Sequence, residues 1–230
     1  MADAPFDPAP ETLLTCTRCP RLVAHREEVA RTKRRSYRDE PYWGRPVPGF
    51  GDVKAKILLL GLAPGAHGSN RTGRMFTGDG SGNFLYPALW RSGLADQPRS
   101  SLDDGLTLTG VFITAAARCA PPGNKPTREE LANCQSWLAR DLMGLSDVRV
   151  VLALGRVAHD SYLAFLQGRG RPLVKAAHRF AHGALHKFDT ENTPPMLDSY
   201  HVSLQNTNTG RLTEAMFDAV LERAKRLAEL

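Results

Sequence analysis

Four cysteines are the residues of this chain whose type and spacing most clearly predict chemistry. Cys16 and Cys19 form a C-x2-C pair, and Cys119 and Cys134 form a second pair with fourteen residues between them. Four thiolates can bind either a zinc ion or a [4Fe–4S] cluster. The wide spacing of the second pair fits zinc-ribbon geometry poorly and favours the cluster, with four unlinked buried cysteines as the alternative. A shared metal centre would tie the N-terminal segment to the middle of the chain.

A glycine-rich segment is the second feature that predicts a binding site. Residues 61–82 contain seven glycines and follow an apolar run. The segment matches neither the P-loop nor the dinucleotide-binding pattern. Glycines let a ligand approach the backbone closely and leave backbone N–H groups free to face it. A long loop that needs unusual dihedral angles is the alternative.

Three side chains could take part in catalysis or in binding a flat ring. Phe76 lies in the glycine-rich segment and is either a core anchor or a stacking platform. Asp79, between two glycines, is a candidate catalytic carboxylate, with a turn aspartate as the alternative. His201 precedes residues rich in side-chain amides, which suit contacts with a phosphate backbone or with base edges. A structural histidine is the alternative for His201.

Strands that alternate with helices must position these residues. Short, mostly apolar runs predict strands at residues 57–60, 111–114 and 148–154, and residues 196–200 are a candidate fourth strand. The run at 57–60 is almost entirely apolar, as in a strand buried on both faces of a parallel sheet. Helices are predicted at residues 20–33, 83–92, 157–166 and 211–230, and from Thr127 onward. Thr127 and Glu130 form a capping box, and residues 178–188 are predicted to be extended or a hairpin. The alternation predicts a three-layer α/β/α domain.

This topology places the candidate residues at one edge of the sheet. In open parallel sheets, ligands bind beyond the carboxyl ends of the strands. The glycine-rich segment, Arg118 with Cys119, and His201 each follow a predicted strand directly. We therefore expect all of them at the carboxyl edge.

The charge balance favours an anionic partner. The chain carries 30 Lys and Arg residues against 24 Asp and Glu residues, a net charge of +6. Nucleic acid is the first candidate partner and an acidic membrane surface the second, with an ordinary solvated surface as the alternative.

The N-terminal residues and the apolar runs bear on location and domain organisation. We find no secretory signal pattern and no apolar run long enough to span a membrane. The cysteines are therefore expected as reduced thiols in the cytoplasm. Residues 1–12 are predicted to be a flexible tail, and residues 13–230 a single domain.

Three segments together resemble the motifs of the family 5 uracil-DNA glycosylases: GLAPGAHGSNRTGRMFTGDGSG, ARCAPPGNKPT and HVSLQNTNTGRLT. The four cysteines resemble the [4Fe–4S] ligands shared by families 4 and 5. The resemblance implies the superfamily fold, with a central four-stranded, mainly parallel sheet between helices. It also implies a monomeric hydrolase that excises uracil, and other deaminated bases such as hypoxanthine, from double-stranded DNA to leave an abasic site.

The resemblance implies a role for each matching residue. Phe76 matches the residue that stacks on the flipped base, Asp79 the carboxylate that positions the attacking water, and His201 the contact to uracil O2 that steadies the leaving anion. The base pocket would be lined by Gly61, Leu62, Ala63, Gly65, Ala66, His67, Gly68 and Ala115. Residues 203–211 match the loop that enters the minor groove. The candidate DNA contacts are Arg71, Arg118, Ser203, Gln205, Asn206 and Arg211.

Two positions depart from the family 4 pattern. Family 4 carries a Glu where Leu62 stands and an Asn that reads the uracil edge where Ala115 stands. Loss of a bidentate amide removes a strong discriminator among bases, so we expect a permissive pocket.

Two other functional classes stay open at this stage. One is a non-catalytic iron–sulfur module that binds nucleic acid or senses redox state, and the other is an enzyme that acts on free nucleotides. The residue that wedges into the duplex is also open among Leu204, Gln205 and Asn206.

Overall fold

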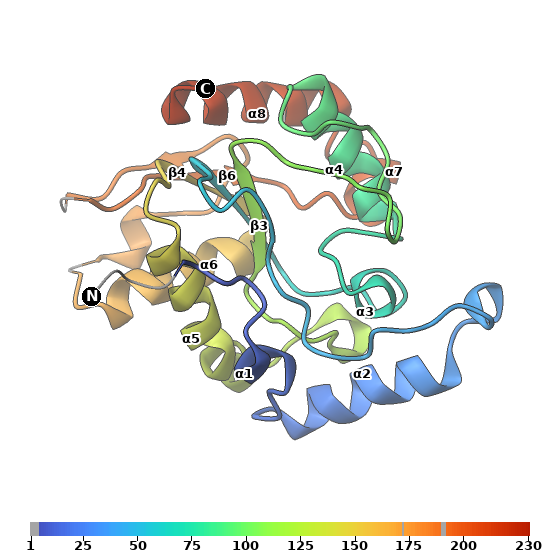
Figure 1. Cartoon of the computed structure of the whole chain (residues 1–230). Coiled ribbons are helices and arrows are strands. Elements are labelled where there is room, and N and C mark those ends of the chain that lie inside the picture. Colours follow the sequence, from blue (N-terminus) through green and yellow to red (C-terminus); the bar gives the residue numbers. More distant parts are fainter. Residues whose placement is uncertain (1–4, 172, 190–191) are drawn as a thin grey trace.

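The computed structural model describes residues 5–171, 173–189 and 192–230, which build a six-stranded sheet in the order β1-β3-β2-β4-β6-β5 (Figure 1). The strands are β1 Phe50–Gly51, β2 Ile57–Gly61, β3 Val111–Ala115, β4 Val150–Leu154, β5 Leu185–His186 and β6 Met196–Ser199. The four inner strands are parallel, and the two short edge strands pair antiparallel to them. The predicted strands are thus the inner four, and the edge strands are additions.

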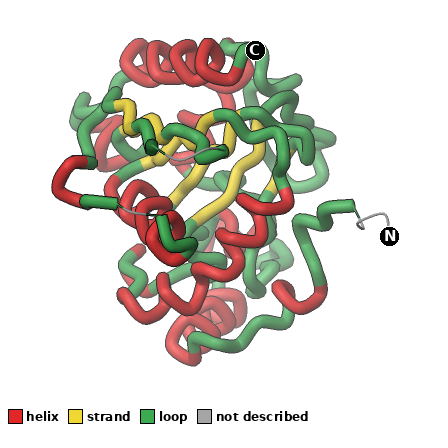
Figure 2. Tube along the Cα trace, turned by 90° about the vertical axis from the view of Figure 1, so that its left-hand side faces the viewer, coloured by secondary structure: helices red, strands yellow, loops and turns green. Residues whose placement is uncertain are grey.

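Helices cover both faces of the sheet. They are α1 Glu11–Leu14, α2 Pro20–Thr32, α3 Ser69–Thr72, α4 Gly80–Arg91, α5 Arg128–Gly144, α6 Arg156–Gly168, α7 Leu204–Asn208 and α8 Glu214–Ala228. Figure 2 shows the strands between the C-terminal helix on one side and other helices on the opposite side. None of the described helices has both the length and the apolar character that crossing a membrane requires.

Each inner strand feeds two hydrophobic cores. Leu59 and Ile113 pack into the core under α4 and α8, whereas Leu58 and Phe112 pack into the core under α5 and α6. Successive side chains of a strand point to opposite faces, so both sets must be apolar. This packing explains the uninterrupted apolar runs and confirms the predicted three-layer α/β/α architecture.

Capping side chains decide where two helices begin. The predicted capping box at the start of α5 is confirmed, because Thr127 N donates to Glu130 Oε2 at 2.7 Å and Glu130 N donates to Thr127 Oγ1 at 3.2 Å. Helix α4 begins at Gly80, three residues before the predicted start at position 83, because Asp79 caps it. A capping carboxylate outweighs the low helix propensity of the two glycines in the first turn.

The N-terminal segment differs from the loose tail expected over residues 1–12. Residues 1–4 lie outside the described residues, but the Phe6 ring lies edge-on to Phe112 with 5.8 Å between ring centroids. The Arg140 guanidinium lies over the Phe6 ring, and Leu13 in α1 is 2% exposed. The described part of the segment is therefore packed against the domain.

Candidate functional site

The carboxyl ends of the inner strands border a cleft of about 810 Å³. Segments from residue 61 to 81, from 123 to 125 and from 201 to 206 form its walls. The residues predicted for the base pocket all line it, as do both predicted catalytic residues: Gly61, Leu62, Ala63, Gly65, Ala66, His67, Gly68, Phe76, Ala115, Asp79 and His201. Parallel pairing of β2 with β3 sets Gly61 beside Ala115, which brings two distant segments of the chain to one wall.

The Asp79 carboxylate is fixed between a helix and a glycine loop. Its Oδ1 accepts hydrogen bonds from the backbone N–H groups of Ser81 at 3.0 Å and Gly82 at 3.1 Å. A Cβ at Gly65 would lie 2.7 Å from Asp79 Oδ2, and one at Gly68 would lie closer still. Burial raises the pKa of Asp79, although the two backbone hydrogen bonds oppose the shift. The glycines of the first motif therefore make room for this carboxylate.

Phe76 sits in a backbone conformation that bulky residues rarely adopt. Its φ is +53°, in the left-handed region, and its side chain is 9% exposed. A Cβ at Gly61 would lie 2.9 Å from the Phe76 ring, and one at Gly82 would collide with the Phe76 carbonyl oxygen. Strain of this kind persists where surrounding structure enforces it, often at a binding site. The two glycines permit this placement of the ring at the cleft wall.

His201 reaches the cleft from the loop after β6. Its ring centroid lies 6.2 Å from that of Phe76, and its Cβ lies 3.1 Å from where a Cβ of Gly155 would be. The Asn206 side-chain amide donates to the His201 carbonyl at 2.8 Å, which ties α7 to this loop. Burial lowers the pKa of His201 to about 4. The imidazole is therefore neutral at physiological pH.

Two arginines expected to contact DNA are internal instead. Arg118 is 1% exposed and forms a buried ion pair with Asp141. Arg71 is paired with Glu40 and donates to the backbone carbonyls of His67 at 2.8 Å and Gly78 at 3.0 Å. The predictions for Arg71 and Arg118 were therefore wrong, because both guanidiniums are used inside the protein. Arg71 instead clamps the two ends of the glycine loop.

Other predicted DNA contacts lie at the cleft or near it. Ser203, Gln205 and Asn206 line the cleft, and Arg211 is exposed with its guanidinium 4.6 Å from the centroid of the Tyr200 ring. Leu204 also lines the cleft and is 53% exposed, so an apolar side chain lies at its rim.

Sequence reasoning missed several residues at the rim of the cleft. Arg34, Tyr37 and the Gly123–Lys125 turn all line it. The run of basic residues from 31 to 38 was a signal for the first two, and the PPGNK sequence was a signal for the third. Neither sequence pattern shows how far its residues lie from the cleft. For Arg34 and Tyr37 this distance depends on where α2 ends.

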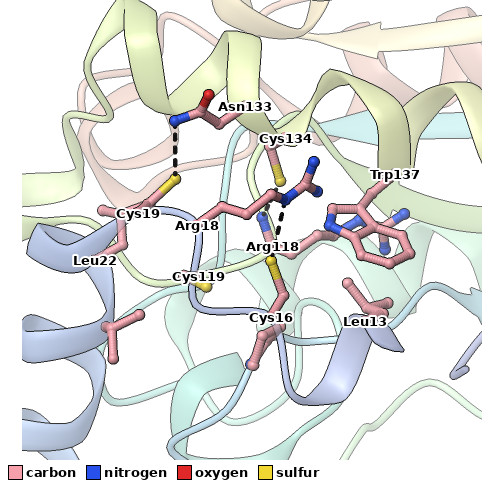
Figure 3. A pocket seen from close by; sticks show the side chains of 12 residues that line it. Leu13, Cys16, Arg18, Cys19, Leu22, Arg118, Cys119, Asn133, Cys134 and Trp137 are labelled. Carbon is pink, nitrogen blue, oxygen red and sulfur yellow. Dashed lines mark hydrogen bonds between the residues drawn. The ribbon is translucent and has the colours of Figure 1, made fainter. Parts of the chain in front are cut away.

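The four cysteines converge on one small pocket (Figure 3). Cys16 and Cys19 lie between α1 and α2, Cys119 follows β3, and Cys134 lies in α5. Its apolar wall includes Leu13, Leu22, Val23 and Trp137. The expected convergence of the two pairs is thus seen in the structure, and none of the four is in a disulfide.

Each cysteine sulfur accepts a hydrogen bond from nitrogen. Donors and distances are Arg18 Nε to Cys16 at 3.3 Å, Asn133 Nδ2 to Cys19 at 3.7 Å, Arg26 Nη1 to Cys119 at 3.0 Å and the backbone N–H of Arg118 to Cys134 at 3.3 Å. Burial alone would oppose negative charge here, and it raises the pKa of Cys134 to about 12. The surrounding donors instead suit sulfur atoms that carry negative charge, as metal-bound thiolates do.

Three buried N–H donors beside this pocket lack an acceptor among the described residues. They are Arg26 Nε, Arg118 Nε and Trp137 Nε1. Buried donors are normally satisfied, so unsatisfied ones indicate an acceptor that the polypeptide does not supply. The donor set and the four thiols therefore fit an electronegative group bound in this pocket.

A second group of potential metal ligands lies elsewhere, at His159, His186 and Asp198, whose ligand atoms are within 4.8 Å of one another. Asp198 is fully buried and accepts hydrogen bonds from His159 Nδ1 at 2.9 Å and from His186 Nε2 at 2.9 Å. His159 Nε2 faces the carbonyl oxygen of His178 at 3.0 Å. Hydrogen bonds thus account for this group without a metal. It joins α6, β5 and β6 below the loop that carries His201.

Replacing Asp198 by asparagine should destabilise the fold by about 3–5 kcal/mol, because removal of one partner leaves buried polar groups uncompensated. The measurement is urea unfolding followed by circular dichroism. Asp160→Asn is the matched control, since Asp160 forms an exposed pair with Arg156 whose loss should change stability by about 0–1 kcal/mol. Equal midpoints for the two variants would contradict a stabilising role for the buried group.

Comparison with known proteins agrees with this geometry. The pattern of the Uracil DNA glycosylase superfamily matches residues 48–225. A type-5 uracil-DNA glycosylase of Thermus thermophilus is 58% identical over 96% of this chain and 97% of its own length. Proteins of the same name are 49% identical in Mycobacterium bovis, over 93% of this chain and 78% of the relative, and 45% identical in Pyrobaculum aerophilum, over 95% and 92%. The chain therefore belongs to the type-5 branch of the uracil-DNA glycosylase superfamily.

Proposed function

We propose that this protein excises uracil from DNA by hydrolysis of the N-glycosidic bond and so begins base excision repair. The observation that carries the proposal is the meeting of Asp79, His201 and Phe76 around one cleft at the carboxyl edge of the sheet. A carboxylate, a neutral imidazole and an aromatic ring are the groups needed to stabilise a sugar cation, stabilise a leaving base and hold a flat ring.

The target nucleotide must leave the duplex before the bond can be reached. Leu204 is exposed at the rim and packs against the position of Gly80, so it is the apolar wedge we favour over Gln205 and Asn206. Asn206 is occupied by its hydrogen bond to the His201 carbonyl. Unpairing is cheapest at a mismatch, so uracil opposite guanine should be a favoured substrate.

Bond cleavage separates two charges, and the two proposed catalytic residues face them. The electron pair of the N–C1′ bond leaves with the base while the sugar gains oxocarbenium character. Asp79, as a carboxylate, stabilises the sugar and orients the water whose oxygen bonds to C1′. Neutral His201 donates an N–H to uracil O2 and stabilises the departing anion. The proton that the attacking water releases neutralises the base anion, so the products are the free base and an abasic site.

The pocket is expected to accept more than uracil. Leu62 and Ala115 both line the cleft, and neither offers a side-chain hydrogen bond to a base edge. Recognition then depends on shape, stacking and backbone groups, which discriminate weakly among similar rings. Hypoxanthine is therefore proposed as a second substrate.

We propose that the cysteine pocket holds a [4Fe–4S] cluster with a structural role. A single zinc with four bonds of about 2.3 Å would hold its sulfurs roughly 3.8 Å apart. No three of the four sulfurs, all within the described chain, lie within 4.8 Å of one another. The wider spacing and the unsatisfied donors support a larger group. When bound, the cluster cross-links the N-terminal segment to β3 and α5, while hydrolysis needs no electron transfer.

The proposed setting follows from the expected chemistry. Reduced cysteines suit the cytoplasm, and the basic net charge of +6 suits a monomer that acts on double-stranded DNA. Residues 13–230 would then work as a single domain.

The test is cleavage of labelled duplexes that contain one U·G, U·A, hypoxanthine·T or T·G pair, followed by alkali to break abasic sites. We expect breaks at uracil in both pairings and weaker breaks at hypoxanthine. A protein that binds these duplexes without releasing any base would instead be a DNA-binding or redox module. Cleavage of free nucleotides with little dependence on salt would indicate a nucleotide hydrolase.

A further inference from the structure

The residues that follow α2 form an exposed basic turn at the rim of the cleft. This basic turn spans residues 33–40 and contains the short 3₁₀ helix Arg35–Tyr37. Arg34, Arg35 and Arg38 are exposed, and Arg34 and Tyr37 line the cleft itself. We propose that the basic turn binds backbone phosphates of the DNA strand beside the nucleotide that enters the cleft. The inference rests on the proposed function, because it assigns a surface to the same substrate.

Internal contacts hold the basic turn in a fixed shape. Lys33 Nζ donates to the carbonyl oxygens of Arg38 at 3.1 Å and Glu40 at 2.7 Å. The Arg71 guanidinium stacks 3.9 Å from the centroid of the Tyr37 ring and pairs with Glu40. Since Arg71 also bonds the loop that carries Asp79, the turn is fixed relative to the catalytic carboxylate. A preorganised surface loses little conformational entropy when it binds.

The exposed guanidiniums of the turn are available to a partner. Within the described residues, no salt bridge involves Arg34, Arg35 or Arg38. Burial is the largest cause that lowers the pKa of His67, and the positive charge of Arg34 is the second. The charge of Arg34 therefore acts at the cleft wall. Guanidinium binds phosphate oxygens bidentately, which makes arginine the residue suited to this contact.

The position of the turn matches the path that DNA must take. Figure 1 shows the segment after α2 and helix α7 at the same side of the molecule, with α3 nearby. Residues of the basic turn and of α7 line the cleft. A flipped nucleotide has phosphates on both sides, so more than one part of the cleft rim should meet the backbone. Helix α7 carries the proposed wedge, and the basic turn supplies positive charge at another part of the rim. Two arginines first expected to do this, Arg71 and Arg118, are internal.

The test compares two triple variants that each remove three positive charges. The first is Arg34→Gln, Arg35→Gln and Arg38→Gln. The control is Arg149→Gln, Arg169→Gln and Arg226→Gln, three exposed positions. Arg149 directly precedes β4 and pairs with Glu229 after α8, which places that pair at the amino edge of the sheet, opposite the cleft. Affinity for an undamaged duplex is measured by fluorescence anisotropy over a series of salt concentrations.

Three phosphate contacts should lower the slope of log K against log salt by roughly 2.7. Between 50 and 200 mM salt, the wild type would then lose about 40-fold more affinity than the basic-turn variant. The control variant should keep the wild-type slope. Phosphate contacts carry no sequence information, so uracil-containing and undamaged duplexes should be affected equally.

Equal slopes for the two triple variants would overturn the inference. Thermal unfolding of both, together with the single variant Arg34→Gln, separates lost binding from lost folding. A basic-turn variant that loses binding to acidic phospholipid vesicles and retains wild-type DNA binding would also overturn it. Failure of the proposed function is seen separately, as a wild-type protein that releases no uracil while its DNA affinity still depends on the turn.

Discussion

Replacing either Asp79 or His201 by alanine lowers the single-turnover rate of uracil excision by roughly tenfold or more. Asp79 is a carboxylate of the cleft, held between the glycine loop and α4, and the neutral His201 reaches the cleft from the loop after β6. Each is proposed to stabilise charge that exists only in the transition state, so its loss should lower the rate of the chemical step rather than binding. The measurement uses enzyme in excess over a duplex with one U·G pair.

The Asp79 variant needs a control for its second role. Asp79 caps α4, and replacing an N-cap residue by alanine costs about 0.5–2 kcal/mol of stability. Thr213→Ala removes a comparable cap from α8, because the Thr213 hydroxyl accepts a hydrogen bond from Met216 N at 3.3 Å. Asp79→Asn keeps a capping oxygen and removes the charge. If Asp79→Asn excises uracil at the wild-type rate, the carboxylate has no catalytic role.

The pH dependence separates the two residues. Burial raises the pKa of Asp79, so the active carboxylate is lost as pH falls through a range above that of an ordinary aspartate. His201 has a pKa of about 4 and stays neutral until the pH approaches that value. The residual activity of Asp79→Asn should therefore stay level with falling pH until it approaches about 4. An unchanged wild-type profile in that variant would assign the acid limb to another group.

The sequence predicted well those features that depend on apolar patterns and on glycine positions. The inner strands β2, β3 and β4 were predictable because burial on both faces favours mostly apolar runs, whereas β6 carries Asp198 and Ser199 and gave a weaker pattern. The short strand β1, Phe50–Gly51, and helices α3 and α7 were not, because two to five residues carry no periodicity. Their positions depend on tertiary contacts. The glycine pattern predicted the cleft, since close backbone approach leaves a signature in the sequence.

Charged residues were predicted less well than glycines. Arg118 and Arg71 were expected to face DNA, but their partners Asp141 and Glu40 lie 23 and 31 residues away along the chain. No local pattern identifies such a partner, so an arginine in a motif can equally serve the motif's own fold. Of the arginines predicted to contact DNA, only Arg211 is exposed, and the other exposed arginines at the cleft, Arg34, Arg35 and Arg38, come from a basic run outside all three motifs. Phe6 is a similar case, because the proline-spaced N-terminal segment carries one apolar side chain that packs against the domain.

Replacing Cys134 by alanine should give a colourless protein that unfolds at a far lower temperature or fails to accumulate. Cys134 lies in α5 and shares its pocket with cysteines from the N-terminal segment and from the loop after β3. Structural metal centres contribute about 10–16 kcal/mol in the small domains where this has been measured, comparable to the whole stability of a typical domain. Loss of one proposed ligand should therefore remove a cross-link that the hydrophobic cores do not replace.

The comparison that isolates the cluster is Ser136→Ala, a change two residues along the same helix that removes only the hydroxyl accepting from Arg18 at 2.8 Å. Visible absorbance, iron and acid-labile sulfide per chain, and thermal unfolding are measured on both variants and the wild type. A wild-type protein that is colourless and holds one zinc ion would show that the pocket binds zinc instead of the cluster. A Cys16→Ala protein that is well folded and fully active would remove the structural role altogether. If activity falls only in proportion to the amount of folded protein, the centre serves to hold the N-terminal segment against the domain. The chemistry would then rest on Asp79 and His201.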